Sequence, residues 1–358
     1  MKRKLGALLA VTTAVLACTS PQPTSTRRDD RNTQSLVDFL DQTVRTKRFR
    51  GAVEVRRGED VVLRRGFDRA DWAGGTPNGP DTRFLIASLT KQFTSLAVLI
   101  LQERGKLRVS DAVCAHLPDC PPDWQPITIE HLLTHTSGLY NYNDDQDAFQ
   151  ERFAGMPPTP AQLIQTFAAR PLEYTPGSRF EYTNSGYVLL GHLIEKVTGE
   201  RYGDFLRREI LDPLGMSNSG YDPGTDHALT YEDWTTPAPH LDEATLFSAG
   251  GMYSTVTDLG RWQQFLLTGR PAIGGRGSVA DLLRPRVALT SLEWYCYGLF
   301  AQGTRSAVES YWHDGRDLGI STYLEFNPTT EVSVTVLANI DTDSINIGRN
   351  IVSLLDND

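Results

Sequence analysis

Strand-like segments lie near both ends of this chain, and a long, mostly helical stretch separates them. The strand-like segments cover residues 51–56, 60–66, 297–302, 321–327 and 331–338. The turns Gly58-Glu59 and Pro328-Thr329-Thr330 predict two hairpins. This order predicts an α/β fold: strands from both ends form one antiparallel sheet, flanked by N- and C-terminal helices, with a mostly helical domain inserted.

Apolar residues at helical spacing predict the helices. These cover residues 35–46, 88–104, 161–169, 186–198, 202–210, 257–267 and 345–355. Thr257 is the predicted N-cap of the sixth helix, and Gly269 its stop. Residues 221–245 are polar and contain Pro, so we expect a long surface excursion there. The α/β part then covers about 34–84 and 245–358, and the helical part about 85–244.

The N-terminus has the features of an export signal. Three basic residues precede an apolar stretch, residues 5–17, that is too short to be a good transmembrane helix. The stretch ends at Cys18 and resembles the bacterial lipoprotein signal, in which the Cys becomes the lipidated first residue; an ordinary signal cleaved nearby is the alternative. We therefore expect a signal peptide at 1–17, lipidation of Cys18, a flexible tether at 18–33 and a place in the cell envelope, facing the periplasm or the cell surface.

Acidic residues outnumber basic ones, 44 Asp and Glu against 35 Lys and Arg, which makes the formal net charge −9. An acidic surface repels phosphates, so nucleic acid is not an expected partner. No apolar run long enough to cross a bilayer follows the N-terminal stretch. The body of the chain is therefore not expected to span a membrane.

Two cysteines, Cys114 and Cys120, bracket a short loop that contains a Pro. Export would place them in an oxidising compartment, which predicts a disulfide between them. Only His116 stands near this pair as a further metal ligand, so a metal site is not expected. Cys296 lies among aromatic residues and is expected to be a small buried apolar side chain.

The first motif with chemical meaning is Ser88-Leu89-Thr90-Lys91, at the start of a predicted helix. Side chains at i and i+3 lie on the same helix face, one turn apart. A Ser hydroxyl is a weak nucleophile until a base takes its proton, and a Lys acts as that base only if its surroundings lower its pKa. The N–H groups of a helix start favour a developing negative charge.

Two further triplets are weak signals alone. Tyr182-Thr183-Asn184 precedes a predicted helix, where a Tyr near a cationic Lys can relay a proton and an Asn amide can hold a substrate carbonyl. His313-Asp314-Gly315 lies between strand-like segments. Its Gly would let the backbone of a substrate approach a strand edge.

The three motifs together resemble the active-site set of the serine β-lactamase-like family, which includes class C β-lactamases, D-alanyl-D-alanine carboxypeptidases, D-aminopeptidases and some esterases. Other stretches resemble the same family. They are Phe84-Leu-Ile-Ala-Ser-Leu-Thr-Lys-Gln-Phe-Thr94, Ile127-Thr-Ile-Glu-His-Leu-Leu-Thr-His-Thr-Ser-Gly-Leu139, Phe180-Glu-Tyr-Thr-Asn-Ser-Gly-Tyr187 and Pro213-Leu-Gly-Met216. The resemblance covers roughly residues 35 to 355.

The resemblance implies a role for each residue. Ser88 would be acylated, and Lys91 with Tyr182 would activate it and return the proton to the leaving group. Asn184 would orient the acyl-side amide of the substrate. His313 would stand where many relatives have Lys. The N–H groups of Ser88 and Arg316 would form the oxyanion hole, and water would hydrolyse the acyl-enzyme without any cofactor.

The departures from the family pattern bear on the substrate. His313 supplies less fixed positive charge than a Lys and resembles the peptidase and esterase branches. Asp314 replaces a hydroxyl residue that helps to hold the substrate carboxylate in penicillin-recognising relatives, so carboxylate-bearing β-lactams are expected to be poor substrates unless Arg316 neutralises Asp314.

We therefore predict a membrane-tethered serine hydrolase acting on a small ester or a D-amino-acid-containing peptide or amide. A true β-lactamase and a non-catalytic envelope-binding protein that retains the fold are the alternatives.

Other polar groups are assigned simpler roles. His131 and His135 have the i, i+4 spacing of metal ligands, but the intervening residues lack the Glu of the His-Glu-x-x-His motif, so both are expected to pack their segment. The run Asp144, Asp145 and Asp147 is expected to be a solvated loop; the alternative is that it borders a cleft and favours cationic substrates.

Overall fold

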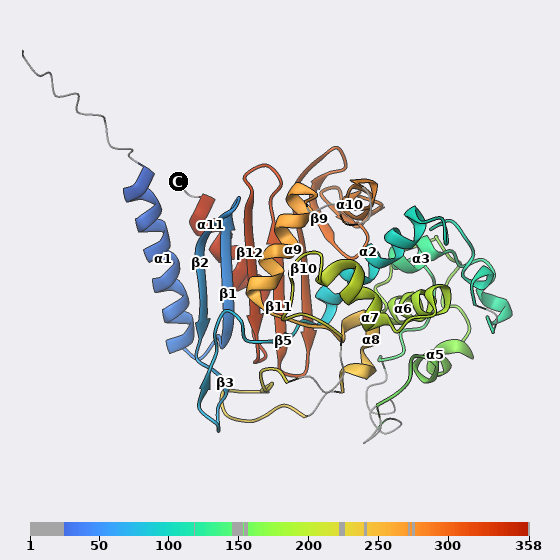
Figure 1. The fold of residues 1–358 in the computed structure, drawn as a ribbon, viewed down its shortest axis with the longest axis horizontal. Helices are drawn as coiled ribbons and strands as arrows, with labels where there is room; N and C mark the ends of the chain where they lie inside the picture. The colour runs from blue at the N-terminus through green and yellow to red at the C-terminus, as the bar shows by residue number, and fades with distance from the viewer. Residues whose placement is uncertain are drawn as a thin grey trace, which may run out of the picture.

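The computed structural model describes residues 25–117, 119–144, 153, 157–221, 226–239, 242–270, 273 and 276–356. In these residues the largest element is an eight-stranded antiparallel sheet of order β2-β1-β12-β11-β10-β9-β8-β7 (Figure 1). In that order the strands are Asp60–Phe67, Gly51–Arg57, Val332–Ala338, Ile320–Phe326, Ala307–Asp317, Phe300–Thr304, Glu293–Tyr295 and Val287–Ala288.

The sheet joins the two ends of the chain at one strand pair. Strand β1 pairs along its whole length with β12, from Gly51 opposite Ala338 to Arg57 opposite Val332. The predicted hairpins β1–β2 and β11–β12 are both present. The predicted α/β fold, with an antiparallel sheet built from both ends of the chain, is confirmed.

Side-chain alternation along the central strands gives the sheet two apolar faces. On one face Val53 and Val336 belong to a cluster with residues of α1 (Ser25–Arg45) and α11 (Ser344–Asp356). On the other face Ala52 and Leu337 belong to a cluster that contains residues of α9 (Val256–Thr268). Figure 1 shows α9 in front of the strands and α11 behind them.

Helix α11 sits closely on the sheet at Gly348. A Cβ at this position would overlap the ring of Tyr323, which is fully buried and held by a hydrogen bond to Glu325. We expect Gly348→Ala to lower the free energy of unfolding by about 1–3 kcal/mol, because the overpacked Cβ would displace helix α11 from the sheet. Thermal or urea denaturation would measure the change. Gly277→Ala is the matched control, since its Cβ would meet only Glu103 at 3.4 Å; an equal loss in both variants would contradict this account.

The helical part lies beside the sheet (Figure 1). The helices predicted at 88–104, 161–169, 186–198 and 202–210 are present with small shifts at their ends, and the short helix at 129–133 was not predicted. In chain order these helices are α2 (Thr90–Glu103), α3 (Ile129–Leu133), α5 (Pro160–Ala168), α6 (Asn184–Thr198) and α7 (Tyr202–Leu206), which continues as a π-helical turn η4 (Arg207–Leu211). Short turns and strands complete the described structure: η1 (Ala87–Leu89), η2 (Val113–Ala115), η3 (Pro122–Trp124), η5 (Glu243–Thr245), α8 (Phe247–Gly250), and the strand pairs β3–β4 (Arg69–Asp71, Thr76–Pro77) and β5–β6 (Phe84–Leu85, Tyr253–Ser254).

Three predicted boundaries are wrong. Helix α9 is capped by Thr255, whose side chain accepts the N–H of Asp258, so the predicted N-cap Thr257 lies inside the helix. Strand β9 starts at Phe300, because the preceding Gly298 has a positive φ that ends extended structure. Helix α1 starts at Ser25, within the predicted tether, because residues 25–33 contain no Pro or Gly to stop a helix that is anchored further along.

Helix α10 (Arg276–Leu283) was not predicted, and neither were strand β10 and the short strands β3 to β8. The signal at 1–17 and Cys18 lie outside the described residues and stay predictions. Within the described residues, every helix is too short or too polar to cross a membrane.

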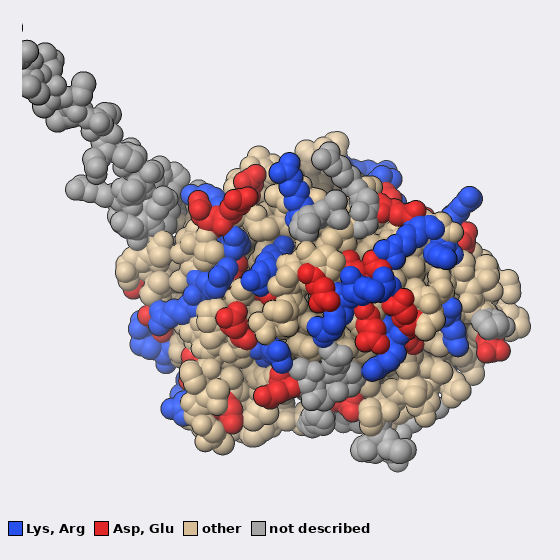
Figure 2. Space-filling view, in the orientation of Figure 1, with Lys and Arg blue, Asp and Glu red and all other residues tan. Residues whose placement is uncertain are grey.

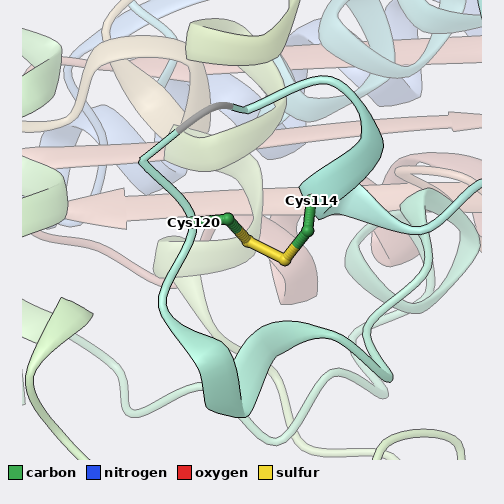
Figure 3. Close-up of a disulfide and its surroundings, with 2 residues drawn as sticks. All are labelled: Cys114 and Cys120. Atoms are coloured by element: carbon green, nitrogen blue, oxygen red, sulfur yellow. A yellow bond between two sulfur atoms is a disulfide. The ribbon is translucent and has the colours of Figure 1, made fainter.

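The disulfide between Cys114 and Cys120 is present, with the two Cα atoms 5.2 Å apart (Figure 3). It closes the loop that follows η2. Cys296 is buried and free, as predicted. Basic and acidic side chains are interspersed over the face seen in Figure 2. Ion pairs occur among the described residues, such as Arg208 with Glu200 at 2.8 Å.

Candidate active site

Ser88 lies in the tight turn η1, directly before helix α2. The residue before it, Ala87, has φ = 46°, a left-handed conformation that costs energy for a side chain with a Cβ. The turn is held against the sheet by Thr322, whose hydroxyl donates to the carbonyl of Ile86 at 3.0 Å. The nucleophile candidate therefore stands on a braced, strained turn between the sheet and the helical part.

Gly315 allows this close approach. A Cβ on Gly315 would lie 2.6 Å from the carbonyl oxygen of Ile86 and 3.0 Å from the Cβ of Ala87. The sequence prediction was that this Gly admits the backbone of a substrate. The structure assigns it another role, because the protein's own nucleophile turn occupies the space.

Lys91 is one helical turn after Ser88 and is fully buried. Its Nζ lies 3.0 Å from Ser88 Oγ, 2.8 Å from Asn184 Oδ1 and 2.8 Å from the carbonyl oxygen of Ala249. Burial lowers the pKa of Lys91 well below its usual value, against a smaller opposite effect of Asp314.

The three partners of the Lys91 Nζ determine how a neutral amine is oriented at this position. The oxygens of Asn184 and Ala249 accept hydrogen bonds and cannot donate, so they take the two N–H groups. The lone pair is then directed at the Ser88 hydroxyl, which becomes the donor. This is the arrangement of a general base and its nucleophile.

Tyr182 stands on the other side of the site, just before α6. The Lys91 Nζ lies 4.8 Å from the centre of its ring. Burial raises the pKa of Tyr182 far above its usual value, and the nearby Ser88 lowers it by less. Its hydroxyl is buried and makes no hydrogen bond of ordinary geometry to a described residue. Burial therefore favours a protonated Tyr182 hydroxyl, which can donate a proton, and an unprotonated Lys91 amine, which can accept one.

Asn184 is fixed by two residues that sequence reasoning missed. Asn141 accepts the backbone N–H of Asn184 at 2.8 Å, and Asn143 accepts from its side-chain amide at 3.1 Å. Both lie just after the signature stretch that ends at Leu139, which was the only signal for them. Asp144, the one described member of the acidic run, accepts from the Asn141 amide.

His313 lies within strand β10, not between strands as predicted, because the polar and Gly-containing sequence around it hides the strand pattern. It is 1% exposed, and its Nδ1 donates to the carbonyl oxygen of Asp314. Nε2 is therefore an acceptor, buried and without a partner among the described residues. Burial lowers the pKa of His313 to about 4, against an opposite effect of Asp314, so the imidazole is neutral at physiological pH.

Strand β10 extends beyond its neighbour at this point. Strand β9 pairs with β10 only as far as Trp312, whereas β11 pairs with β10 to Asp317. Residues 313–317 therefore form a sheet edge beside the nucleophile turn.

A cleft of about 510 Å³ opens onto Ser88. It is lined by Ala87, Ser88, Asn143, Asn184, Glu232, Leu246, Ala249, Gly250, Arg316, Asp317, Leu318, Gly319 and Asp341. Three of these side chains are acidic and one is basic. The one basic side chain among the described lining residues, Arg316, lies 3.9 Å from Asp314 and 3.7 Å from Asp343.

The acidic lining residues were not predicted. Glu232 comes from the segment expected to be a surface excursion, and Asp341 follows the last strand. The ion pairs of Arg316 go to Asp314 and Asp343, not to Glu232, Asp317 or Asp341, and burial raises the pKa of Asp317 above its usual value. The cleft therefore carries excess negative charge.

The described residues contain no cluster of three or more metal-ligating side chains. His131 caps α3, where its Nδ1 accepts the N–H of Thr128. The ring of His135 is hydrogen-bonded to the backbone N–H of Thr183 and to the Tyr295 hydroxyl. The predicted residues Ser88, Lys91, Tyr182, Asn184 and His313 come together at one site, with Gly315 and Arg316 on the adjoining strand edge.

A buried Lys that faces a Ser on a braced turn, in a sheet-and-helix fold of this kind, defines a serine hydrolase. The chain belongs to the beta-lactamase family, whose model matches residues 36–354. It is 28% identical over 322 residues to PbpX of Bacillus subtilis (strain 168), covering 88% of this chain and 75% of that protein.

Solved structures agree with this assignment. The penicillin-binding protein from Bacillus halodurans superposes with a TM-score of 0.79 at 28% identity, covering 90% of this chain and 98% of that one. A D-stereospecific amidohydrolase from Streptomyces sp. gives a TM-score of 0.70 at 27% identity, covering 88% of this chain and 96% of that one.

Proposed function

We propose that this protein hydrolyses amides or esters of D-amino acids through an acyl-enzyme on Ser88. The observation that carries the proposal is the three-way contact of the Lys91 Nζ with Ser88 Oγ, Asn184 Oδ1 and the Ala249 carbonyl oxygen. In a neutral amine the two acceptors take the N–H groups, which leaves the lone pair for the Ser88 hydroxyl. The likeness to a D-stereospecific amidohydrolase supports the substrate class.

In the proposed reaction Ser88 Oγ attacks the acyl carbon while its proton passes to Lys91 Nζ. The N–H groups of Ser88 and Arg316 stabilise the oxyanion. The leaving group departs with a proton delivered through the Tyr182 hydroxyl. Water then attacks the Ser88 ester and gives up a proton to the Lys91 amine. Lys91 returns that proton to the departing Ser88 Oγ, and the acid is released.

The charge of the cleft supports a substrate with a free ammonium group. Glu232, Asp317 and Asp341 line the cleft beside the nucleophile, and Arg316 is already shared between two carboxylates. A cation is attracted to this lining, and a carboxylate such as that of a β-lactam is repelled. Hydrolysis of β-lactams is therefore the less favoured alternative.

We expect D-alanine p-nitroanilide to have a kcat/KM roughly 10- to 100-fold above that of its N-succinyl derivative, and of a penicillin or cephalosporin. The first comparison replaces the ammonium beside the acyl group by an amide that ends in a carboxylate, so it changes size as well as charge, and the next two measurements isolate the charge. The double variant Glu232→Gln, Asp317→Asn should lower the ratio of the kcat/KM values for the two anilides. High salt should lower this ratio too, because it screens exposed charges. Equal turnover of the two anilides, or efficient β-lactam hydrolysis, would refute the proposal.

A further inference from the structure

His135 holds the segment that carries Tyr182. It is fully buried, and its ring is stacked on the Tyr182 ring with centroids 4.2 Å apart and an interplanar angle of 29°. Its carbonyl oxygen accepts the N–H of Glu181 at 2.9 Å, and its Nδ1 accepts the N–H of Thr183 at 3.2 Å. One residue thus contacts three successive residues of the active-site segment.

The hydrogen bonds of His135 determine its protonation state. A backbone N–H can only donate, so Nδ1 of His135 carries the lone pair toward Thr183 and Nε2 carries the proton. Nε2 donates to the Tyr295 hydroxyl at 2.9 Å. Burial lowers the pKa of His135 well below its usual value. Both ring nitrogens of a neutral His135 therefore form hydrogen bonds within the protein.

The backbone of His135 is also constrained. Its φ is 56°, in the left-handed region that most side chains avoid and that Asn tolerates best after Gly. This conformation turns the carbonyl and the ring of the same residue toward one neighbouring segment, residues 181–183. Tyr182 depends on that support, because its hydroxyl makes no hydrogen bond of ordinary geometry to a described residue.

We propose that His135 is a positioning residue for Tyr182: its neutral ring and its carbonyl hold residues 181–183 so that the Tyr182 hydroxyl faces Ser88. The inference rests on the proposed function, in which Tyr182 delivers a proton to the leaving group. It assigns a specific task to a residue that sequence spacing marked only as packing.

The test exploits the need of the leaving group for a proton. An aniline must gain a proton to leave, whereas p-nitrophenolate leaves without one. His135→Asn keeps a residue that tolerates the backbone conformation but removes the stacked ring. We expect it to lower kcat for D-alanine p-nitroanilide by roughly 30- to 300-fold, and kcat for the p-nitrophenyl ester by less than about fivefold.

Three further variants calibrate the result. Tyr182→Phe should show the same bias toward ester, and the double variant Tyr182→Phe, His135→Asn should lose little more, because the two residues act as a unit. His131→Asn, in the same segment but outside the site, should leave the ratio unchanged. Equal losses with both substrates, or losses that multiply in the double variant, would overturn the inference while leaving the hydrolase assignment intact.

A second readout needs no turnover. With fluorotyrosine in the protein, the resonance that disappears in Tyr182→Phe reports on Tyr182. We expect this resonance to shift or broaden in His135→Asn and to stay in place in His131→Asn. An unchanged resonance in His135→Asn would overturn the inference even if the protein hydrolysed neither substrate, whereas absent turnover with the expected shift would count against the proposed function alone.

Discussion

Replacing Ser88 by Ala is expected to lower kcat/KM for every hydrolysed substrate by roughly 10⁴- to 10⁶-fold. The other side chains of the site hold protons or orient groups, and none of them can take the acyl group in place of the Ser88 hydroxyl. The fold should persist, because the change removes one oxygen whose hydrogen-bond partner, Lys91, keeps two other contacts. Steady-state hydrolysis of a p-nitrophenyl ester would measure the loss.

Ser95→Ala is the matched control for this variant. Ser95 is a buried serine on the same helix, α2, and its hydroxyl lies 3.1 Å from that of Tyr187. Its removal should change activity by only a small factor. Turnover by Ser88→Ala near that of the unchanged protein would mean that the acyl-enzyme assignment is wrong.

Replacing Lys91 by Met is expected to lower kcat/KM by roughly 10²- to 10⁴-fold and to change its pH dependence. A base acts in its deprotonated form, so activity of the unchanged protein should rise with pH through the pKa of Lys91. Burial places that rise well below the usual lysine value. His313 adds no further step above about pH 5, because its pKa is about 4.

A pH series of kcat/KM for the unchanged protein, Lys91→Met and Lys106→Met would test this. Lys106 is exposed, so its replacement should leave both the rate and the pH profile unchanged. If Lys91→Met retained the rise, another group would be the base. A rise centred near the usual lysine pKa would show that burial does not activate Lys91.

The sheet core could be predicted because its strands alternate or are apolar throughout. Strand β12 is buried at every position, and its hairpin with β11 has a clear turn. Strand β10 could not be predicted in the same way. It carries Asp314, Gly315 and Arg316 where a core strand would carry apolar residues, because this stretch forms the edge of the cleft. Residues of the cleft edge therefore stand at positions where apolar residues would have indicated a strand.

The residues of the site likewise divide into those that could be predicted from the sequence and those that could not. Ser88, Lys91, Tyr182, Asn184 and His313 could be found because they belong to short motifs with recognisable neighbours. Glu232 and Asp341 could not, because loops far apart in the chain bring them to the cleft. The contact of His135 with Tyr182 is a tertiary one across 47 residues of chain, and i, i+4 spacing on one segment could not indicate it.

The most direct test of the account is the mass of the protein after rapid mixing with a D-aminoacyl p-nitrophenyl ester and quenching in acid. We expect an added mass equal to one acyl group, carried by the peptide that contains Ser88 and absent from Ser88→Ala. An adduct on another residue, or the same adduct in Ser88→Ala, would contradict the assignment of Ser88 as the nucleophile.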